Sequence, residues 1–332
     1  MPFVQGDSYP ELMPAPPGVL VLRSENFVAW VIPYGARLMQ LFWLHAPEGV
    51  RPLSLGFNEP DAYRQDTMSI GAVCGRYGNR IGGAVLERGD ERYVLDANHP
   101  LGHCIHGGSA GWGQRDWQIG QQDSGGIVLT LDSADGDMGF PGRCQGRVLY
   151  RLEGDRLLWQ ADARLDADSP INIVQHSYWN LDGTANICGH TLQVDADSYH
   201  PVGAQELPLP AVPVDGTCFD FRHGVPVAPA CVPHLDVAMV LRSGAGAVRP
   251  VARVQAGGIA MQVSTDRPFL HLYASGSLRP RSPALGVPHG PGAGLCLETE
   301  DMPNGPAWGS DVWYGPQREY HHTLALDFSF TS

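Results

Sequence analysis

The sequence predicts an all-β protein, a large and mostly antiparallel β-sandwich. Only 17% of its 332 residues are charged, whereas Gly (41) and Pro (28) are plentiful, which suits short strands joined by turns. No segment sustains a 3.6-residue apolar period over more than a few turns, so long amphipathic helices are not expected. All-β folds of this length often form one unit. We therefore expect a single domain over residues 1–332, with residues 1–17 as an irregular lead-in.

The first strands form a predicted meander. Three apolar runs, Val19–Arg23, Phe27–Ile32 and Leu38–Leu44, are separated by short segments rich in turn-forming residues. The polar segment Asp61–Met68 that follows is expected to be a short helix or a turn.

Further strands fill the middle and the end of the chain. Gly146–Leu152 and Arg156–Leu165 flank a Glu-Gly-Asp turn and predict a hairpin. In Thr323–Phe330 large apolar residues alternate with small or polar ones, which predicts that Phe330 is buried and Ala325 open to solvent. The remaining predicted strands are Arg92–Leu95, Gly126–Asp132, Thr191–Val194, Val251–Val254, Ile259–Ser264, Phe269–Tyr273 and Gly294–Glu298.

Two Pro-rich segments, Tyr199–Pro213 and Arg279–Pro291, are predicted to be long loops within the domain. Long loops in β folds often frame binding sites.

The charge and the cysteines restrict partners and location. A net charge of −13 argues against nucleic acid or an anionic membrane as the main partner, because both need a basic surface. The N-terminus has neither a basic start nor an apolar run, so no signal peptide is expected, and no apolar stretch reaches membrane-spanning length. The seven cysteines are odd in number and widely spaced, without a Cys-x-x-Cys pair. They favour a reducing compartment, and we expect a cytoplasmic protein.

The segment Ile171–Gly183 is the most informative part of the chain. Alternating apolar residues begin it as a strand, and an Asp-Gly turn signal ends it. Between them lies His176, next to Ser, Tyr, Trp and Asn side chains that hydrogen-bond or stack on a sugar. His176 is therefore our first candidate for acid–base chemistry on a sugar.

A series of short motifs carries a resemblance along nearly the whole chain. The matching stretches are Tyr34–Ala36, Leu55–Phe57, Gly75–Ile81, His106–Gly108, Gly139–Gly142, His176–Leu181, Leu235–Val237 and Cys296–Thr299. Each motif alone is weak, but together and in this order they resemble the aldose 1-epimerase (galactose mutarotase) family.

The resemblance implies a β-supersandwich fold and interconversion of the α and β anomers of aldoses, with no metal and no cofactor. By matched position, His176 would be the general acid and Glu298 the general base. The residues that would bind sugar hydroxyls or steady the charge are Asn79, Arg80, His106 and Asp236.

The chemistry of the reaction agrees with these roles. Opening a cyclic hemiacetal removes a proton from the C1 hydroxyl and adds one to the ring oxygen, which suits a carboxylate and an imidazolium acting together. Arg80 cannot act as a base, but its fork of donors can hold adjacent hydroxyls. Tyr178, Trp179 and, less strongly, Trp112 are candidate aromatic platforms for the apolar side of a sugar.

Taken singly, these residues also have structural explanations. Arg80 and Asp236 could form a structural ion pair, and a lone buried histidine is usually a satisfied core residue. Only the joint order of the motifs favours the functional interpretation.

Two other motifs lead elsewhere. Gly107–Gly111 fits the Gly-x-Ser-x-Gly nucleophile elbow of α/β-hydrolases, but Gly111-Trp112-Gly113 is a poor helix start after it. His103, Cys104 and His106 are possible zinc ligands by type. An odd separation places His103 and His106 on opposite sides of a strand, so we expect a sugar contact from His106 rather than a metal site.

Departures from the family pattern concern sugar preference. Gln175 stands where the family usually has Asn, Val237 where it often has His, and Glu300 where it usually has Gln.

The main hypothesis is an epimerase of free aldohexoses such as galactose or glucose, with a monosaccharide as its partner. A non-catalytic sugar-binding domain and a hexose-6-phosphate 1-epimerase are the alternatives; the latter needs cations beyond Arg76 and Arg80. The sequence leaves monomer and homodimer open.

Overall fold

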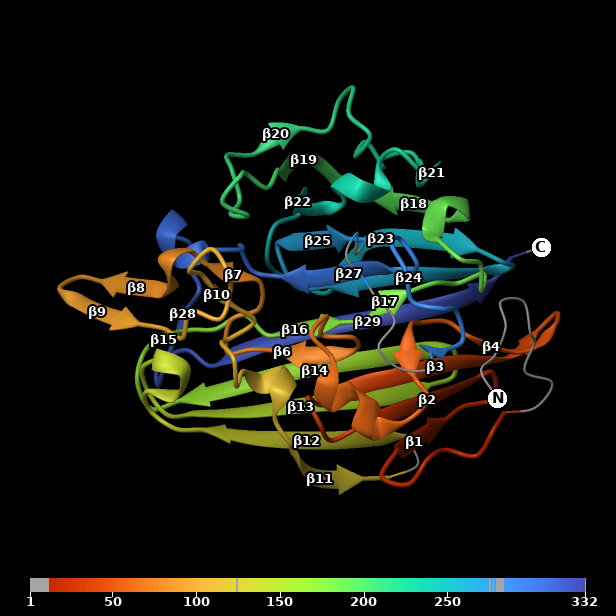
Figure 1. The fold of residues 1–332 in the computed structure, drawn as a ribbon, viewed down its shortest axis with the longest axis horizontal. Coiled ribbons are helices and arrows are strands. Elements are labelled where there is room, and N and C mark those ends of the chain that lie inside the picture. Colours follow the sequence, from red (N-terminus) through yellow and green to blue (C-terminus); the bar gives the residue numbers. More distant parts are fainter. Residues whose placement is uncertain (1–11, 124, 275, 277, 279–283, 332) are drawn as a thin grey trace.

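The largest sheet in the described part of the chain is antiparallel and has nine strands (Figure 1). In this computed structural model, which describes residues 12–331 apart from 124, 275, 277 and 279–283, the C-terminal strand runs through the middle of that sheet. In spatial order the strands are β11 (Gln118–Gln122), β12 (Gly126–Ser133), β13 (Cys144–Glu153), β14 (Arg156–Leu165), β29 (Tyr320–Phe330), β24 (Ile259–Thr265), β23 (Arg249–Ala256), β18 (Thr191–Val194) and β21 (Val225–Pro226).

Two smaller sheets pack on the nine-stranded sheet. One has six strands, in the order β17 (Tyr178–Trp179), β27 (Leu295–Glu300), β25 (Phe269–Tyr273), β22 (Asp236–Leu241), β19 (Ala196–His200) and β20 (Val212–Pro213). The other is the N-terminal meander of β1 (Leu20–Arg23), β2 (Phe27–Ile32), β3 (Arg37–Ala46) and β4 (Gly49–Pro52).

Short elements complete the fold. The remaining strands are β5 (Gly56–Phe57), β6 (Ala72–Cys74), β7 (Arg80–Ile81), β8 (Val85–Arg88), β9 (Glu91–Val94), β10 (Cys104–Ile105), β15 (Ser169–Pro170), β16 (Val174–His176), β26 (Ala284–Leu285) and β28 (Trp313–Tyr314). The 3-10 helices are η1 (Pro60–Gln65), η2 (Gly82–Ala84), η3 (Trp112–Gln114), η4 (Asp137–Gly139), η5 (Ile187–Gly189), η6 (Val232–His234) and η7 (Gly305–Trp308). No helix within the described ranges has the length and apolarity that a bilayer crossing requires.

The main core lies between the nine-stranded sheet and the two smaller ones. Trp159 and Leu326 of the large sheet belong to one buried cluster with Trp43 of the meander and Leu297 of the six-stranded sheet. Burying a side chain of the size of leucine stabilises a fold by roughly 1.5–3 kcal/mol. Strand β27 uses only alternate residues for this core, so its other face is available for polar side chains.

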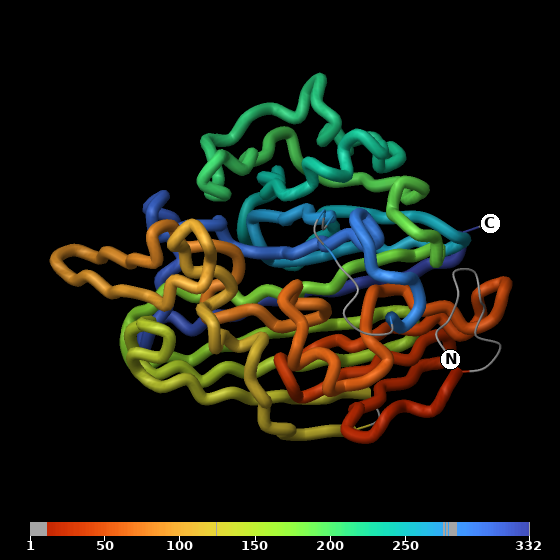
Figure 2. Tube along the Cα trace, viewed as in Figure 1, coloured from red at the N-terminus to blue at the C-terminus, as the bar shows by residue number. Residues whose placement is uncertain are grey.

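The strands that carry the site are brought together from distant parts of the chain. The segment around residue 175 runs beside the segment around residue 298 (Figure 2), since Tyr178 of β17 pairs with Cys296 of β27. His176 of β16 pairs with Ala72 of β6 in the same region.

The structure confirms the all-β, antiparallel prediction and most predicted strands. The hairpin of β13 and β14 is present, and β2, β18 and β25 have the predicted bounds. The segment Asp61–Met68, predicted as a short helix or a turn, overlaps most of η1. Strand β22, which places Asp236, was not predicted because an Asp opens it and a long loop precedes it.

Some details differ from the predictions. Phe330 is 47% exposed, whereas Ala325 is buried, because Phe330 is the last residue of the strand and the middle of β29 is covered on both faces. Within Tyr199–Pro213 the ends are strands β19 and β20, and residues 201–211 form the connecting loop. Part of the predicted loop Arg279–Pro291 and residues 1–11 of the lead-in lie outside the described residues; residues 12–17 contain no helix or strand.

Candidate active site

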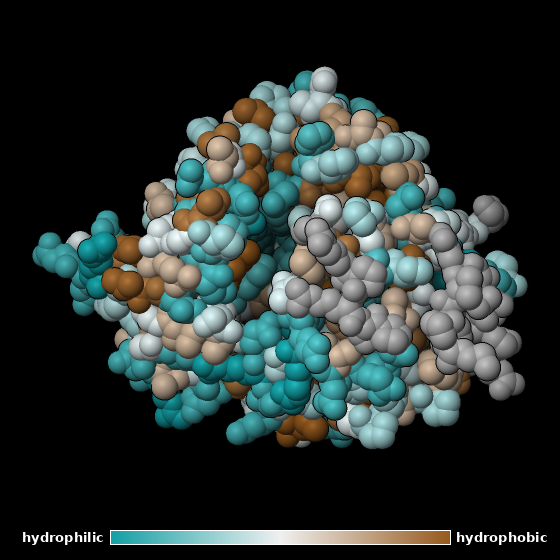
Figure 3. All heavy atoms as spheres, in the orientation of Figure 1, coloured by the Kyte–Doolittle hydropathy of each residue, from teal (hydrophilic) through white to brown (hydrophobic). Residues whose placement is uncertain are grey.

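A polar cavity opens beside the six-stranded sheet. Its volume is about 770 Å³, in the range of small-molecule sites, and His176, Glu298, Arg80 and Asp236 are among the residues that line it. The face of the molecule in Figure 3 is hollowed near its centre, and hydrophilic residues are visible inside this hollow.

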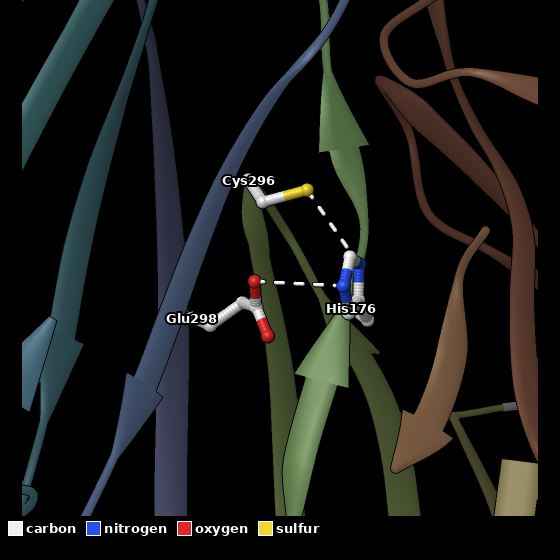
Figure 4. A group of neighbouring side chains, drawn as sticks. All are labelled: His176, Cys296 and Glu298. Carbon is white, nitrogen blue, oxygen red and sulfur yellow. Dashed lines mark hydrogen bonds and ion pairs between the residues drawn. The ribbon is translucent and has the colours of Figure 1, made fainter. Parts of the chain in front are cut away.

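His176 and Glu298 face each other in this cavity (Figure 4). The distance from His176 Nε2 to Glu298 Oε1 is 3.6 Å, and both side chains are almost completely buried. Cys296 Sγ lies 3.6 Å from the other ring nitrogen, Nδ1. The structure thus brings together an imidazole and a carboxylate, the two groups that acid–base chemistry at one sugar carbon needs.

His106 presents a neutral donor to the same cavity. The backbone N–H of Asn79 donates to His106 Nδ1 at 3.2 Å, so the proton of the neutral ring is on Nε2. Burial, followed by electrostatic repulsion from His176 and Arg80, lowers the pKa of His106 well below 6.5. Its ring stands edge-on to that of His176, with centroids 5.3 Å apart.

Two of the sequence motifs shape the wall around these groups. Gly107 has a φ of +84°, and a Cβ there would collide with the carbonyl oxygen of Gly75, which explains the glycine after His106. The buried Arg76 donates to the carbonyl oxygens of Pro141 and Gly142, at 2.9 and 2.7 Å. Arg76 therefore fixes the Gly-Phe-Pro-Gly turn, and it is not among the residues that line the cavity.

Asp236 is held by a buried histidine. His271 Nε2 lies 2.8 Å from Asp236 Oδ1, and His271 Nδ1 lies 3.5 Å from Glu300 Oε1. Burial would lower the pKa of His271, but the Asp236 hydrogen bond and the charges of Glu300 and Asp236 raise it to about 9. For Asp236, burial is likewise outweighed by His271 and Arg80, so that its pKa is lowered. His271 is thus a cation between two carboxyl groups at neutral pH.

Glu300 lies behind the cavity wall, fully buried. The side-chain amides of Asn172 and Asn79 point Nδ2 at its two oxygens, at 3.2 and 3.4 Å. Burial raises the pKa of Glu300 to about 8. The predicted sugar ligand Asn79 therefore also supports this internal network.

Arg80 completes the polar wall. Its Nη2 is 2.9 Å from Glu206 Oε2 and 3.9 Å from Asp236 Oδ2. The Glu206 carboxylate is closer to Arg80 than the Asp236 carboxylate is, and Asp236 lies closer to His271 than to Arg80. Arg80 and Asp236 therefore do not form the simple structural ion pair that the sequence left open.

Tyr178 and Trp179 point to opposite sides of strand β17. Tyr178 lines the cavity with its ring centroid 5.1 Å from that of His176, and its hydroxyl donates to the Met68 carbonyl oxygen at 2.8 Å. Trp179 instead packs in the main core, 6.3 Å from the ring of Phe328. Because neighbouring residues of a strand face opposite ways, the expectation that Trp179 contacts the sugar is corrected.

Trp112 also belongs to the core. It is buried against Trp117, with ring centroids 5.6 Å apart, and is not among the cavity-lining residues.

The predicted alternative zinc ligands are engaged elsewhere. His103 Nδ1 accepts from the Gly83 N–H and its Nε2 donates to the Gln205 carbonyl oxygen, while burial raises the pKa of the Cys104 thiol to about 12. In the described part of the chain, a group with metal-ligand atoms close together is His176, Cys296 and Glu298, within 4.8 Å of one another.

By type, these three residues could hold zinc. Burial raises the pKa of Cys296 well above its ordinary value, so that an ion would have to displace its proton. Moreover, Cys296 and Glu298 contact different nitrogens of His176. This arrangement suits proton transfer by the imidazole better than a shared ion.

Sequence reasoning did not identify His271, Tyr273 or Glu206 as cavity residues. The sequence did contain a signal for His271 and Tyr273. In the predicted strand Phe269–Tyr273, these two residues alternate with the apolar Leu270 and Leu272. That alternation places His271 and Tyr273 on the face opposite the core. Glu206 lies in a loop whose position no periodicity predicts.

An antiparallel sandwich in which an imidazole and a carboxylate face each other in a polar cavity fits an enzyme that acts on a small, hydroxyl-rich molecule. Comparison with known proteins agrees. The family profile described as aldose 1-epimerase matches residues 18–327. Aldose 1-epimerase of Escherichia coli is 32% identical over 93% of this chain and 94% of its own length, and human galactose mutarotase is 33% identical over 93% of both.

Solved structures show the same fold. An aldose epimerase homologue from C. elegans superposes with a TM-score of 0.88 at 26% identity, covering 95% of this chain and 99% of its own. Galactose 1-epimerase from Lactobacillus acidophilus gives a TM-score of 0.84 at 25% identity, with 95% of each chain covered. The chain belongs to the aldose 1-epimerase family.

Proposed function

We propose that this protein is an aldose 1-epimerase, an isomerase that interconverts the α and β anomers of free aldoses. The observation that carries the proposal is the 3.6 Å approach of His176 Nε2 to Glu298 Oε1 inside a polar cavity. Membership of the family supports the same activity.

In the proposed mechanism Glu298 and His176 act together at C1. The Glu298 carboxylate accepts the proton of the C1 hydroxyl while the protonated His176 donates to the ring oxygen, and the bond between C1 and the ring oxygen breaks. The result is the open-chain aldehyde. Rotation about the C1–C2 bond presents the other face of the carbonyl, and reversal of both proton transfers closes the ring as the opposite anomer. Each positioned acid or base typically contributes about 10²–10⁴-fold to the rate.

The other cavity residues would hold the sugar. His106 Nε2–H and the Arg80 guanidinium are donors for sugar hydroxyls, whereas the Asp236 carboxylate accepts from them. The Tyr178 ring, adjacent to His176, offers an apolar surface for the ring hydrogens of the sugar.

Two alternatives have less support. A non-catalytic sugar-binding domain would be expected to have lost the acid or the base, and both are present and adjacent. A hexose 6-phosphate needs cations at the cavity, but Arg76 is engaged with backbone carbonyls and Arg80 faces Glu206 and Asp236. We therefore propose a free aldohexose, of the galactose or glucose type, as the substrate.

We further propose that the chain works as one domain in the cytoplasm. The site draws residues from Asn79 to Glu298, which makes the parts of the chain interdependent. All seven cysteines are free thiols, as expected in a reducing compartment.

The direct test follows the optical rotation of freshly dissolved α-galactose and α-glucose with and without the protein. The proposal predicts equilibration far faster than in buffer. Sugar binding by calorimetry without accelerated equilibration would select the sugar-binding alternative, and acceleration only for the 6-phosphate would select the phosphorylated substrate.

A further inference from the structure

A carboxylate from the loop between β19 and β20 enters the wall of the cavity. Glu206 lines the cavity, and its Oε2 lies 2.9 Å from Arg80 Nη2 and 3.1 Å from His99 Nε2. We infer that Glu206 is a specificity-determining residue, whose charge makes the site select uncharged aldoses over sugars that carry a carboxylate or phosphate. This inference rests on the proposed function and adds a selection rule to it.

The loop holds Glu206 in place on both sides. The carbonyl oxygen of Gln205 accepts from His103 Nε2 at 2.8 Å, and the Leu207 side chain lies against Gly82. Glu206 itself has a φ of +53°, a left-handed conformation that costs roughly 1–2 kcal/mol in a residue with a side chain. Neighbouring contacts therefore maintain a backbone conformation that turns this carboxylate toward Arg80.

Arg80 is the group in the wall to which an anionic sugar would be drawn. Its side chain is 13% exposed, and its buried Nε has no hydrogen-bond partner among the described residues. An anion that approaches Arg80 also approaches two carboxylates, those of Glu206 and Asp236, at 2.9 and 3.9 Å from the guanidinium. His271 balances the charge of Asp236, and Glu206 balances that of Arg80, so that this wall offers an anion no net positive charge and still donates to neutral hydroxyls.

The rim of the cavity follows the same pattern. Arg64, which also lines it, pairs with Asp116 at 2.7 Å. Both arginines in the described lining thus face carboxylates. The Glu206 side chain is 47% exposed, so that solvent screens its charge and the selection depends on ionic strength.

The test compares galactose with galacturonate, which differ in charge at one carbon. Anomer exchange is measured by magnetisation transfer between the anomeric NMR signals for the wild type and Glu206→Gln. We expect the ratio of kcat/KM for galacturonate to that for galactose to rise about tenfold in Glu206→Gln, since removing one unit charge at several ångströms changes an interaction by that order. The increase should shrink at high salt.

Glu87→Gln is the matched control. It removes the same charge from a largely exposed glutamate outside the described cavity lining, which likewise faces an arginine, Arg92, at 3.8 Å, and it should leave the ratio unchanged. A ratio equal to that of the wild type in Glu206→Gln, or an equal rise in Glu87→Gln, would overturn the inference.

Calorimetry separates this inference from the proposed function. If the wild type exchanged no sugar, the proposed function would fail, but the ratio of galacturonate to galactose affinity in the wild type and in Glu206→Gln would still decide the role of Glu206. An unchanged affinity ratio refutes it, and a rise of about tenfold supports it.

Discussion

Two histidine–carboxylate pairs lie side by side in this molecule. His176 faces Glu298, and one strand further His271 faces Glu300, with similar separations of 3.6 and 3.5 Å. Glu298 and Glu300 are two residues apart on β27, on the same face of the strand, and His271 is the direct cross-strand neighbour of Glu298.

The surroundings of the two pairs differ. The first pair lines the cavity with both members, whereas Glu300 is enclosed by Asn172 and Asn79, and His271 is also bound to Asp236. We therefore propose that the first pair exchanges protons with a ligand and that the second holds the first pair's neighbours in position. The two pairs have the same residue types; of their four members, only Glu300 is outside the described cavity lining.

The largest effect should come from breaking the first pair. His176→Ala and Glu298→Gln are each expected to lower kcat/KM by about 10²–10⁴-fold, because each removes one proton transfer. The double variant should be little worse than the more damaged single one, because the two groups act as a unit. Polarimetry of the three variants tests this, and near-wild-type turnover in either single variant would contradict the assigned roles.

A smaller effect is expected from the second pair. His271→Gln keeps a donor for Asp236 but removes the cation between two carboxyl groups. We expect kcat/KM to fall about 10–100-fold, which corresponds to the free energy of one hydrogen bond to a charged group. Adding Glu300→Gln to His271→Gln should restore part of the loss, because no buried unpaired carboxylate is left. Kinetics of both variants test this, and a strictly additive loss would show that the two residues are not coupled.

The second pair should also contribute to the pH dependence of stability. The folded-state pKa of Glu300 is raised from 4.5 to about 8 and that of His271 from 6.5 to about 9, so that each group binds more protons in the folded protein than in the unfolded chain in its own window. The stabilisation that Glu300 contributes should therefore be lost as pH rises from 4.5 to 8, and that of His271 as pH rises from 6.5 to 9. Glu300→Gln should make the slope of the free energy of unfolding against pH less negative between pH 4.5 and 8, by up to about 1.4 kcal/mol per pH unit.

Urea unfolding at several pH values measures this slope. Asp61→Asn serves as the control, because its carboxylate is fully exposed. Identical slopes in the wild type and Glu300→Gln would show that the buried carboxyl does not titrate in this way.

The smallest effect on activity is expected from Trp179. Trp179→Phe should lower the free energy of unfolding by about 1–3 kcal/mol and change KM less than twofold, because its ring packs in the core. The matched change on the other face of the strand, Tyr178→Leu, should raise KM several-fold by removing the ring beside His176. A large KM effect of Trp179→Phe would restore the idea that it contacts the sugar.

The fold was predictable where hydrophobic alternation is local. Strands such as β2, β14 and β25 bury one face or both and are bounded by turn residues, which a single sequence displays. Two-residue strands such as β7 and β10 depend on long-range pairing and carry no such signal.

The site residues were predictable where they belong to a motif of the family. His176, Glu298, His106, Asp236, Arg80 and Asn79 were expected together, and they do meet around one cavity. The alternation of side chains along a strand was also informative. If His176 points into the cavity, Tyr178, two residues later, points to the same side and Trp179 to the opposite side. The alternation in Phe269–Tyr273 indicated the face of His271, but its pairing with Glu300 could not be foreseen, because the other neighbours of Glu300 come from residues more than 100 positions away.

The most direct test is a crystal structure of Glu298→Gln with galactose bound, since this variant should keep the sugar without turning it over. We predict that the ring oxygen lies within hydrogen-bond distance of His176 Nε2, about 2.6–3.2 Å, and that the C1 hydroxyl lies equally close to the side chain at position 298. A sugar bound with C1 away from both side chains would contradict the account.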